Sequence, residues 1–140
     1  MRGFLLDTNC ISELVRLKPE PRVLEWIGSS DERSLYISVL TLGEIRKGLE
    51  KLPKVKRRAG LETWLVELKL RFAGRLLPIE EAVADRWGLL AAQANREGKH
   101  IAVIDGLLAA TALCHDLTIV TRNIGDFKVG QISAFNPWES

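Results

Sequence analysis

The chain has 140 residues, of which 46% are hydrophobic and 27% charged, and its formal net charge is +2. This length is typical of one domain with its own core, and the composition excludes a disordered or low-complexity protein. The first apolar run is too short for a signal peptide and no apolar stretch of about 18 residues follows, so we expect a cytoplasmic protein without a membrane span. Cys10 and Cys114 are far apart, which argues against a disulfide framework and a zinc site and predicts two reduced, mostly buried thiols.

The first half of the chain predicts two strands and four helices. Apolar runs at residues 4–6 and 35–37 are typical of buried strands, and a polar-apolar pattern from Ile11 onward predicts a helix. Residues 21–28 predict a short helix with Pro21 in its first turn and Gly28 closing it. Apolar residues at helical spacing over 41–52 and 61–72 predict a helical hairpin, interrupted at Pro53 and joined by a basic linker.

The second half continues the alternation. Strands are expected at 76–77 and 117–120, with another possible at 132–135, and helices at 83–94, ended by Gly98, and from Asp105 to residue 113. Parallel neighbouring strands need crossover connections, which are usually helices. The fold class is therefore α/β, with a mostly parallel central sheet flanked by helices, and residues 1–140 are expected to form a single domain.

Four acidic residues follow the predicted strands or begin the predicted helices. Asp7 ends the first strand, Glu44 lies in the helix after the second, Asp105 opens a helix, and Asp126 lies in the loop after the strand at 117–120. Ligands of an open α/β sheet bind beyond the carboxyl ends of the strands, so these side chains are expected in one cleft. A divalent cation would relieve their repulsion, and oxygen ligands without His or Cys favour Mg²⁺ or Mn²⁺.

Each acid taken alone also has an ordinary structural interpretation. Asp7 and Asp105 are suitable helix N-caps, Glu44 is compatible with a solvated helix face, and Asp126 with an Asx turn. The order and spacing of the motifs as a set are more specific than any one of these residues.

That set of motifs resembles the PIN domain of the VapC type, over almost the whole chain. The matching segments are Leu5-Leu6-Asp7-Thr8-Asn9 with Ser12-Glu13, Ile37-Ser38-x-x-Thr41-x-x-Glu44-Ile45-x-x-Gly48, Asp105-x-x-x-Ala109-Ala110-Thr111-Ala112 and Thr121-Arg122-Asn123-x-x-Asp126-Phe127. The closing Phe135-Asn136-Pro137-Trp138 is similar to the FitB branch of that group.

The resemblance implies a Mg²⁺- or Mn²⁺-dependent endoribonuclease toxin that a VapB-like antitoxin holds inactive, and a homodimer. Asp7, Glu44 and Asp105 correspond to the acidic metal-binding residues, and Asp126, or alternatively Asn123, to the fourth. The metal would bind the scissile phosphate of RNA and activate a water, so that no protein nucleophile is needed. Polar neighbours would orient the carboxylates, although a hydroxyl after a strand is more often a local backbone cap; these neighbours are Thr8, Asn9, Ser38, Thr121 and Asn123.

A basic segment supplies candidate RNA contacts. Between residues 46 and 58 a single acid, Glu50, stands among seven basic residues, Arg46, Lys47, Lys51, Lys54, Lys56, Arg57 and Arg58. We predict RNA binding by Arg46, Lys47 and Lys51, with a merely solvated basic helix as the alternative.

Several other functions are compatible with parts of this pattern. His100 and His115 lie outside the motifs and are expected at the surface, which argues against histidine acid-base ribonuclease chemistry. A receiver domain would need a paired acid at the first strand and a late pocket lysine, and a haloacid-dehalogenase-like phosphatase would need a second Asp at Asn9. An RNA-processing PIN nuclease without an antitoxin, or a noncatalytic RNA-binding PIN-like module, remains open.

Overall fold

A computed structural model describes residues 3–53 and 56–139 of the chain. Five short strands form one sheet in the order β3-β2-β1-β4-β5, and every neighbouring pair is parallel. Each of the five is two to four residues long, as their bounds show: β1 (Phe4–Leu6), β2 (Leu35–Ser38), β3 (Leu76–Leu77), β4 (Thr118–Val120) and β5 (Ala134–Phe135). The predicted α/β class and parallel sheet are confirmed.

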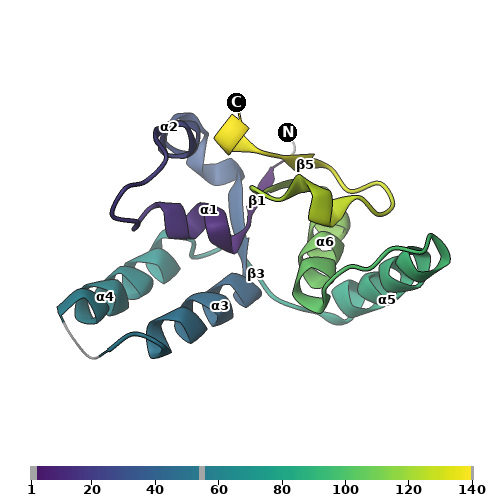
Figure 1. Cartoon of the computed structure of the whole chain (residues 1–140), viewed down its shortest axis with the longest axis horizontal. Coiled ribbons are helices and arrows are strands. Elements are labelled where there is room, and N and C mark those ends of the chain that lie inside the picture. Colours follow the sequence, from purple (N-terminus) through teal and green to yellow (C-terminus); the bar gives the residue numbers. More distant parts are fainter. Residues whose placement is uncertain (1–2, 54–55, 140) are drawn as a thin grey trace.

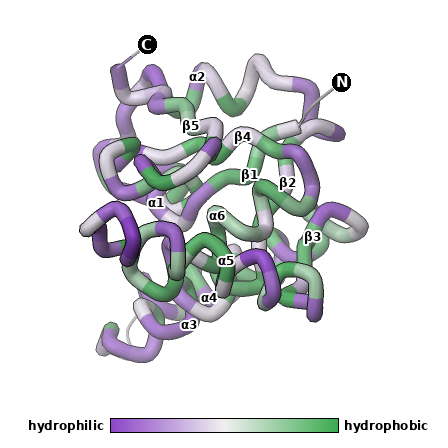
Figure 2. Tube along the Cα trace, turned by 90° about the vertical axis from the view of Figure 1, so that its right-hand side faces the viewer, coloured by the Kyte–Doolittle hydropathy of each residue, from purple (hydrophilic) through white to green (hydrophobic). Residues whose placement is uncertain are grey.

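The central strands are apolar because both faces of the sheet are covered, and Figure 2 shows β1, β2 and β4 as hydrophobic segments inside the molecule. Successive side chains of a strand point to opposite faces. Leu6 and Val120 therefore belong to one core cluster, and their neighbours Leu5 and Ile119 to the other.

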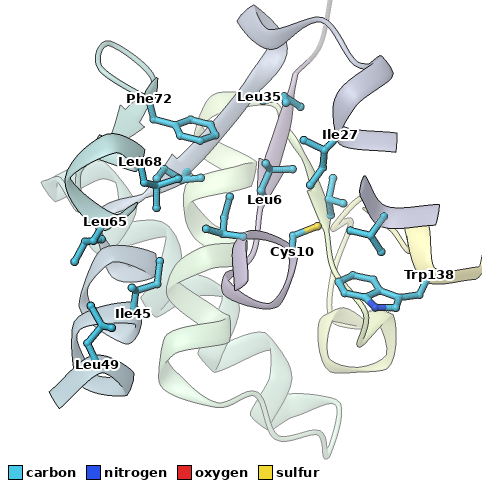
Figure 3. Close-up of a cluster of buried hydrophobic side chains, with 14 residues drawn as sticks. Leu6, Cys10, Ile27, Leu35, Ile45, Leu49, Leu65, Leu68, Phe72 and Trp138 are labelled. Carbon is cyan, nitrogen blue, oxygen red and sulfur yellow. The ribbon is translucent and has the colours of Figure 1, made fainter. Parts of the chain in front are cut away.

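Four helices cover the first face, and they carry the larger of the two core clusters (Figure 3). The contacts include Ile45 and Leu49 of one helix and Leu65 and Leu68 of the next, with Phe72 beyond them. The helices are α1 (Thr8–Glu13), α2 (Pro21–Ser29), α3 (Val39–Glu50) and α4 (Lys56–Arg71). The helical hairpin that the apolar spacing predicts is thus present as α3 and α4.

Two helices, α5 (Glu81–Arg96) and α6 (Val103–His115), pack against each other and cover the second face, on the far side of the sheet from α3 and α4 (Figure 1). Their close approach depends on Gly106, because a Cβ atom there would lie 2.9 Å from the Trp87 ring. The small residues predicted in α6 are therefore a packing feature of this helix pair.

Helix ends are where the predictions and the structure differ. α1 begins at Thr8, three residues before Ile11, because Asp7 caps it. α2 continues through Gly28 to Ser29, so Gly28 is inside the helix and does not close it. α6 begins at Val103, two residues before Asp105, and its N-cap is Ala102. Turns of 3-10 helix complete the described fold: η1 (Glu32–Ser34), η2 (Ile124–Phe127) and η3 (Pro137–Glu139).

Candidate metal centre

Asp7 lies at the carboxyl end of the central strand β1, where its backbone N–H donates to the carbonyl of Val120 on β4 over 3.1 Å. Its carboxylate accepts a hydrogen bond from the Cys10 backbone N–H over 2.9 Å and so caps α1. A second hydrogen bond joins this carboxylate to the Thr121 side chain. The capping interpretation of Asp7 is therefore correct, and the same carboxylate also faces the other acids.

Charge and burial act together on two of the acids. Burial raises the pKa of the Asp7 carboxyl, and the nearby charges of Glu44 and Asp105 raise it further, against the lowering effect of its hydrogen bonds. Burial also raises the pKa of Asp105, with added contributions from Asp126 and Glu44. Glu44 on α3 thus lies within electrostatic range of both Asp7 and Asp105, whereas Asp126 on η2 acts on Asp105.

Glu44 reaches this region from the second turn of α3, and its side chain is held by Thr8. Thr8 Oγ1 donates a hydrogen bond to Glu44 Oε1, and it lies 3.3 Å from the hydroxyl of the fully buried Thr41. Thr8 begins α1, so this contact ties α1 to α3 beside the acids. Glu44 is exposed, as its solvated-helix interpretation requires, but its carboxylate is engaged with the site.

Asp105 and Asp126 come from the other side of the sheet. Asp105 is in the first turn of α6, half-buried, and it is not the helix cap, so that alternative is wrong. Asp126 lies on η2, just after β4, with Asn123 as the residue before that turn. Both Asp126 and Asn123 are exposed, and it is Asp126 whose charge acts on Asp105.

The donors suit a hard divalent cation in kind, since they are carboxylate and hydroxyl oxygens. As the side chains stand, however, no three His, Cys, Asp or Glu residues within 3–53 and 56–139 are close enough together to hold one ion. Glu44 and Asp126 are the exposed members; Glu44 is held by Thr8, so Asp126 is the side chain with room to move toward Asp105.

The polar neighbours divide into caps and orienting groups. Ser38 is fully buried and accepts from the Leu40 backbone N–H over 3.0 Å, so it caps α3. Thr121 does both, since it accepts from the Asn123 N–H over 3.1 Å and hydrogen-bonds to Asp7. Asn9 is exposed on α1. Thr41 is not among the residues predicted to orient the carboxylates, although its position one helical turn before Glu44 indicated that it could do so.

The basic segment is largely engaged within the protein. Arg46 pairs with Glu62 at 2.7 Å, and Arg58 pairs with Glu50 at 2.7 Å, which links α3 to α4. Lys47 and Lys51 are exposed, and Lys54 lies outside the described residues. RNA contact through Arg46 would have to compete with its ion pair, whereas Lys47 and Lys51 are accessible.

The remaining candidates for chemistry lie away from the acids. His100 and His115 are exposed, as predicted. Both cysteines are free, but Cys114 is exposed, so its predicted burial is wrong. Burial raises the pKa of the Cys10 thiol far above neutrality, which keeps it protonated and unsuited to metal binding. No helix in the described part of the chain is long and apolar enough to cross a membrane.

Comparison with known proteins gives one consistent family. Residues 4–129 match the PIN domain family. Toxin FitB of Neisseria gonorrhoeae is 42% identical over 135 residues, covering 96% of this chain and 97% of its own, and VapC ribonuclease Y4jK of Sinorhizobium fredii is 39% identical over 136, with the same coverage. The crystal structure of FitAcB from N. gonorrhoeae contains a chain that superposes with a TM-score of 0.93 at 40% identity, over 98% of this chain and 99% of that one. The chain therefore belongs to the PIN-domain family, in the group that contains FitB and the VapC ribonucleases.

Proposed function

We propose that this protein is a Mg²⁺- or Mn²⁺-dependent endoribonuclease, and that it is the toxin of a type II toxin–antitoxin pair. The observation that carries the proposal is that four acidic side chains, from four separate segments, lie near the carboxyl edge of the sheet, where the charges of neighbouring acids act on Asp7 and on Asp105. The names of two relatives, a toxin and a VapC ribonuclease, support the substrate class and the biological role.

The residues present suit hydrolysis of a phosphodiester. Bound Mg²⁺ or Mn²⁺ would supply charge neutralisation at the phosphate and activation of a water. Asp7 and Asp105, whose pKa values are raised first by burial and further by the neighbouring acids, would hold the ion, with Glu44 and Asp126 completing the set. Thr8 fixes Glu44 and Thr121 fixes Asp7, so two of the four carboxylates are already oriented.

A protein partner fits the same site. A chain 40% identical to this one occurs in a structure described as FitAB bound to an IR36 DNA fragment. We propose a VapB-like antitoxin that places a cationic side chain, most suitably an arginine, among the four acids, because a guanidinium satisfies two carboxylate oxygens at once. An amphipathic helix of the antitoxin would lie on the α3–α4 hairpin, where Val66 is 57% and Leu70 72% exposed.

The homodimer that the resemblance implies could use the tryptophans Trp26 and Trp64, which lie on apolar helix stripes, but both pack within the protomer. Trp26 packs edge-on against Phe4, with ring centroids 5.1 Å apart, and also contacts Phe135. Trp64 packs on the larger core cluster. Both tryptophans are thus explained by the protomer, and the dimer remains a prediction that a solution mass at micromolar concentration tests.

The test of activity is cleavage of a mixed single-stranded RNA by purified protein, with Mn²⁺ and with EDTA. An Asp105→Asn variant purified in parallel controls for contaminating ribonuclease. We expect cleavage only by the wild type with metal, without 2′,3′-cyclic phosphate ends, because water and not the 2′-hydroxyl attacks. RNA binding without cleavage would favour the noncatalytic module.

The toxin role needs a separate test. The short reading frame next to the gene is co-expressed with this protein, the complex is purified, and Mn²⁺ is titrated against its ribonuclease activity. We expect inhibition that high Mn²⁺ relieves. Failure to co-purify, or full activity within a stable complex, would favour the RNA-processing nuclease.

A further inference from the structure

A polar hollow of about 510 Å³ adjoins the acidic site and is separate from the four carboxylates. One wall is α1 and the residues just after it, and the other is the β4–η2 loop with the C-terminal η3. The lining side chains used below are Asn9, Ser12 and Arg16 on the first wall and Arg122, Asn123 and Trp138 on the second.

The hollow and the acidic site share their framework. Asp7 caps α1, which carries Asn9 two residues later. On the other wall the Thr121 hydroxyl joins the Asp7 carboxylate and accepts from the Asn123 backbone N–H over 3.1 Å. A strand of RNA whose scissile phosphate lies at the acids therefore has this hollow as an adjacent position for its next nucleotide.

Arg122 is held in the hollow by the C-terminal segment. The Asn136 side-chain amide donates to the Arg122 carbonyl over 3.1 Å, and its oxygen accepts from the Trp138 N–H over 2.8 Å. The Trp138 ring then lies under the Arg122 guanidinium, 5.7 Å from ring centroid to Cζ. The acidic centre alone does not explain the closing Phe135-Asn136-Pro137-Trp138 motif. These contacts give the motif a role, which is to hold Arg122 in place.

The charge of Arg122 is available to a ligand. Within residues 3–53 and 56–139 no carboxylate forms an ion pair with Arg122, and its side chain is exposed. Across the hollow, Glu13 is only 2% exposed and both of its oxygens are used, one by Arg16 at 2.9 Å and one by the Glu20 N–H at 2.9 Å. The hollow thus has two guanidinium groups against one fully engaged carboxylate, and its net charge is positive.

We infer that this hollow binds the RNA phosphate next to the scissile one, with Arg122 as the contact residue, Arg16 facing it, and Asn136 and Trp138 as positioning residues. The inference rests on the proposed ribonuclease function. A guanidinium can donate two parallel hydrogen bonds to a phosphodiester, and this geometry needs a fixed plane, which the Trp138 ring provides. Phosphate is favoured over a partner protein's carboxylate because the RNA strand must continue past the acids.

The test measures binding of a labelled single-stranded RNA by fluorescence anisotropy, in EDTA and in an Asp105→Asn background, so that cleavage plays no part. Arg122→Gln should weaken binding about tenfold and lower the slope of log K against log salt by about 0.7, the loss of one phosphate contact on a single strand. Arg122→Lys should keep the slope. Trp138→Leu should weaken binding about two- to fivefold.

The matched control is Arg33→Gln, which removes the same charge from η1, at the opposite edge of the sheet, and should leave affinity and slope unchanged. In the cleavage-competent protein, Arg122→Gln should raise KM and leave kcat unchanged, with an unchanged melting temperature.

If wild type cleaves RNA and Arg122→Gln binds RNA normally, the subsite assignment is wrong and the ribonuclease proposal stands. If Arg122→Gln binds RNA normally but no longer binds the co-expressed antitoxin, the hollow is a protein contact and the inference is overturned. If wild type neither binds nor cleaves RNA, both proposals fail.

Discussion

Thr8 donates a side-chain hydrogen bond to Glu44, which joins the first residue of α1 to the second turn of α3 beside the acidic site. Thr8→Val keeps the side-chain shape and removes the donor, so Glu44 loses its fixed orientation. We predict a fall of about 10- to 100-fold in metal affinity or cleavage rate. The rate of RNA cleavage at several Mn²⁺ concentrations measures it.

The control for this change is Thr63→Val, since the Thr63 hydroxyl donates only to the Ala59 carbonyl on the surface of α4. It should cleave RNA at the wild-type rate. A Thr8→Val protein as active as Thr63→Val would show that Glu44 needs no support from Thr8.

Asp7 has a structural and a chemical role that two substitutions separate. Asp7→Asn keeps an oxygen that accepts from the Cys10 N–H, so α1 stays capped while the charge is lost. Asp7→Ala also loses the cap, which should cost about 1 kcal/mol in the free energy of unfolding. We expect both variants to be inactive. In urea unfolding, Asp7→Ala should be less stable than Asp7→Asn. Cleavage by Asp7→Asn at the wild-type rate would remove Asp7 from the metal site.

The acids also predict how stability depends on pH in metal-free buffer. Asp105 has a raised pKa, chiefly from burial, so it contributes stability at acid pH that is lost as pH rises through its folded pKa. Asp105→Asn should therefore gain stability relative to wild type as pH rises above the ordinary carboxyl pKa of about 4. Urea unfolding across this range measures the difference.

Glu13 provides a control of opposite sign. Burial would raise its pKa, but the Glu20 N–H and the Arg16 guanidinium hold it below the usual range. Its contribution is present above the ordinary carboxyl pKa and is lost as pH falls through the lowered one. Glu13→Gln should therefore lose stability relative to wild type as pH rises. Parallel curves for Asp105→Asn and Glu13→Gln would contradict these assignments.

Arg75 is predicted to be a determinant of stability far from the acids. Its guanidinium donates to the backbone carbonyls of Glu32 and Leu35 over 2.7 and 2.6 Å and lies over the Phe72 ring. Arg75→Lys cannot reproduce this fork, so it should lose about 1–3 kcal/mol in unfolding free energy. Arg33→Lys, at a side chain that is 90% exposed, is the control and should change stability by less than about 0.5 kcal/mol. Equal effects would show that the Arg75 contacts are replaceable.

Much of this architecture could be predicted because the pattern of apolar residues determines where the strands and helices lie. The strand at residues 4–6 and the helical hairpin are fixed by runs of residues that must be buried, such as Leu6 and Leu65. Helix starts were less predictable, because α6 begins at Val103 without any side-chain cap. Periodicity gives no sign of such a start.

The site could be predicted only as a set of residue types. Strand ends place Asp7 at the sheet edge, but whether Glu44 is held there depends on Thr8, which is 36 residues away in sequence. The ion pair of Arg46 with Glu62 could not be predicted either, since Glu62 lies on another helix. Such pairings are tertiary contacts, and a local pattern does not specify them.

The central claim, one shared metal centre built from these acids, is tested most directly by thermal unfolding of the free protein during a Mn²⁺ titration. A ligand that binds only the folded state stabilises it by about 2.7 kcal/mol at a hundred times its Kd. The melting temperature of wild type should rise steadily with Mn²⁺, while Asp7→Asn and Asp105→Asn should show little or no rise. A wild type that does not respond, or an equal rise in all three proteins, would contradict the account.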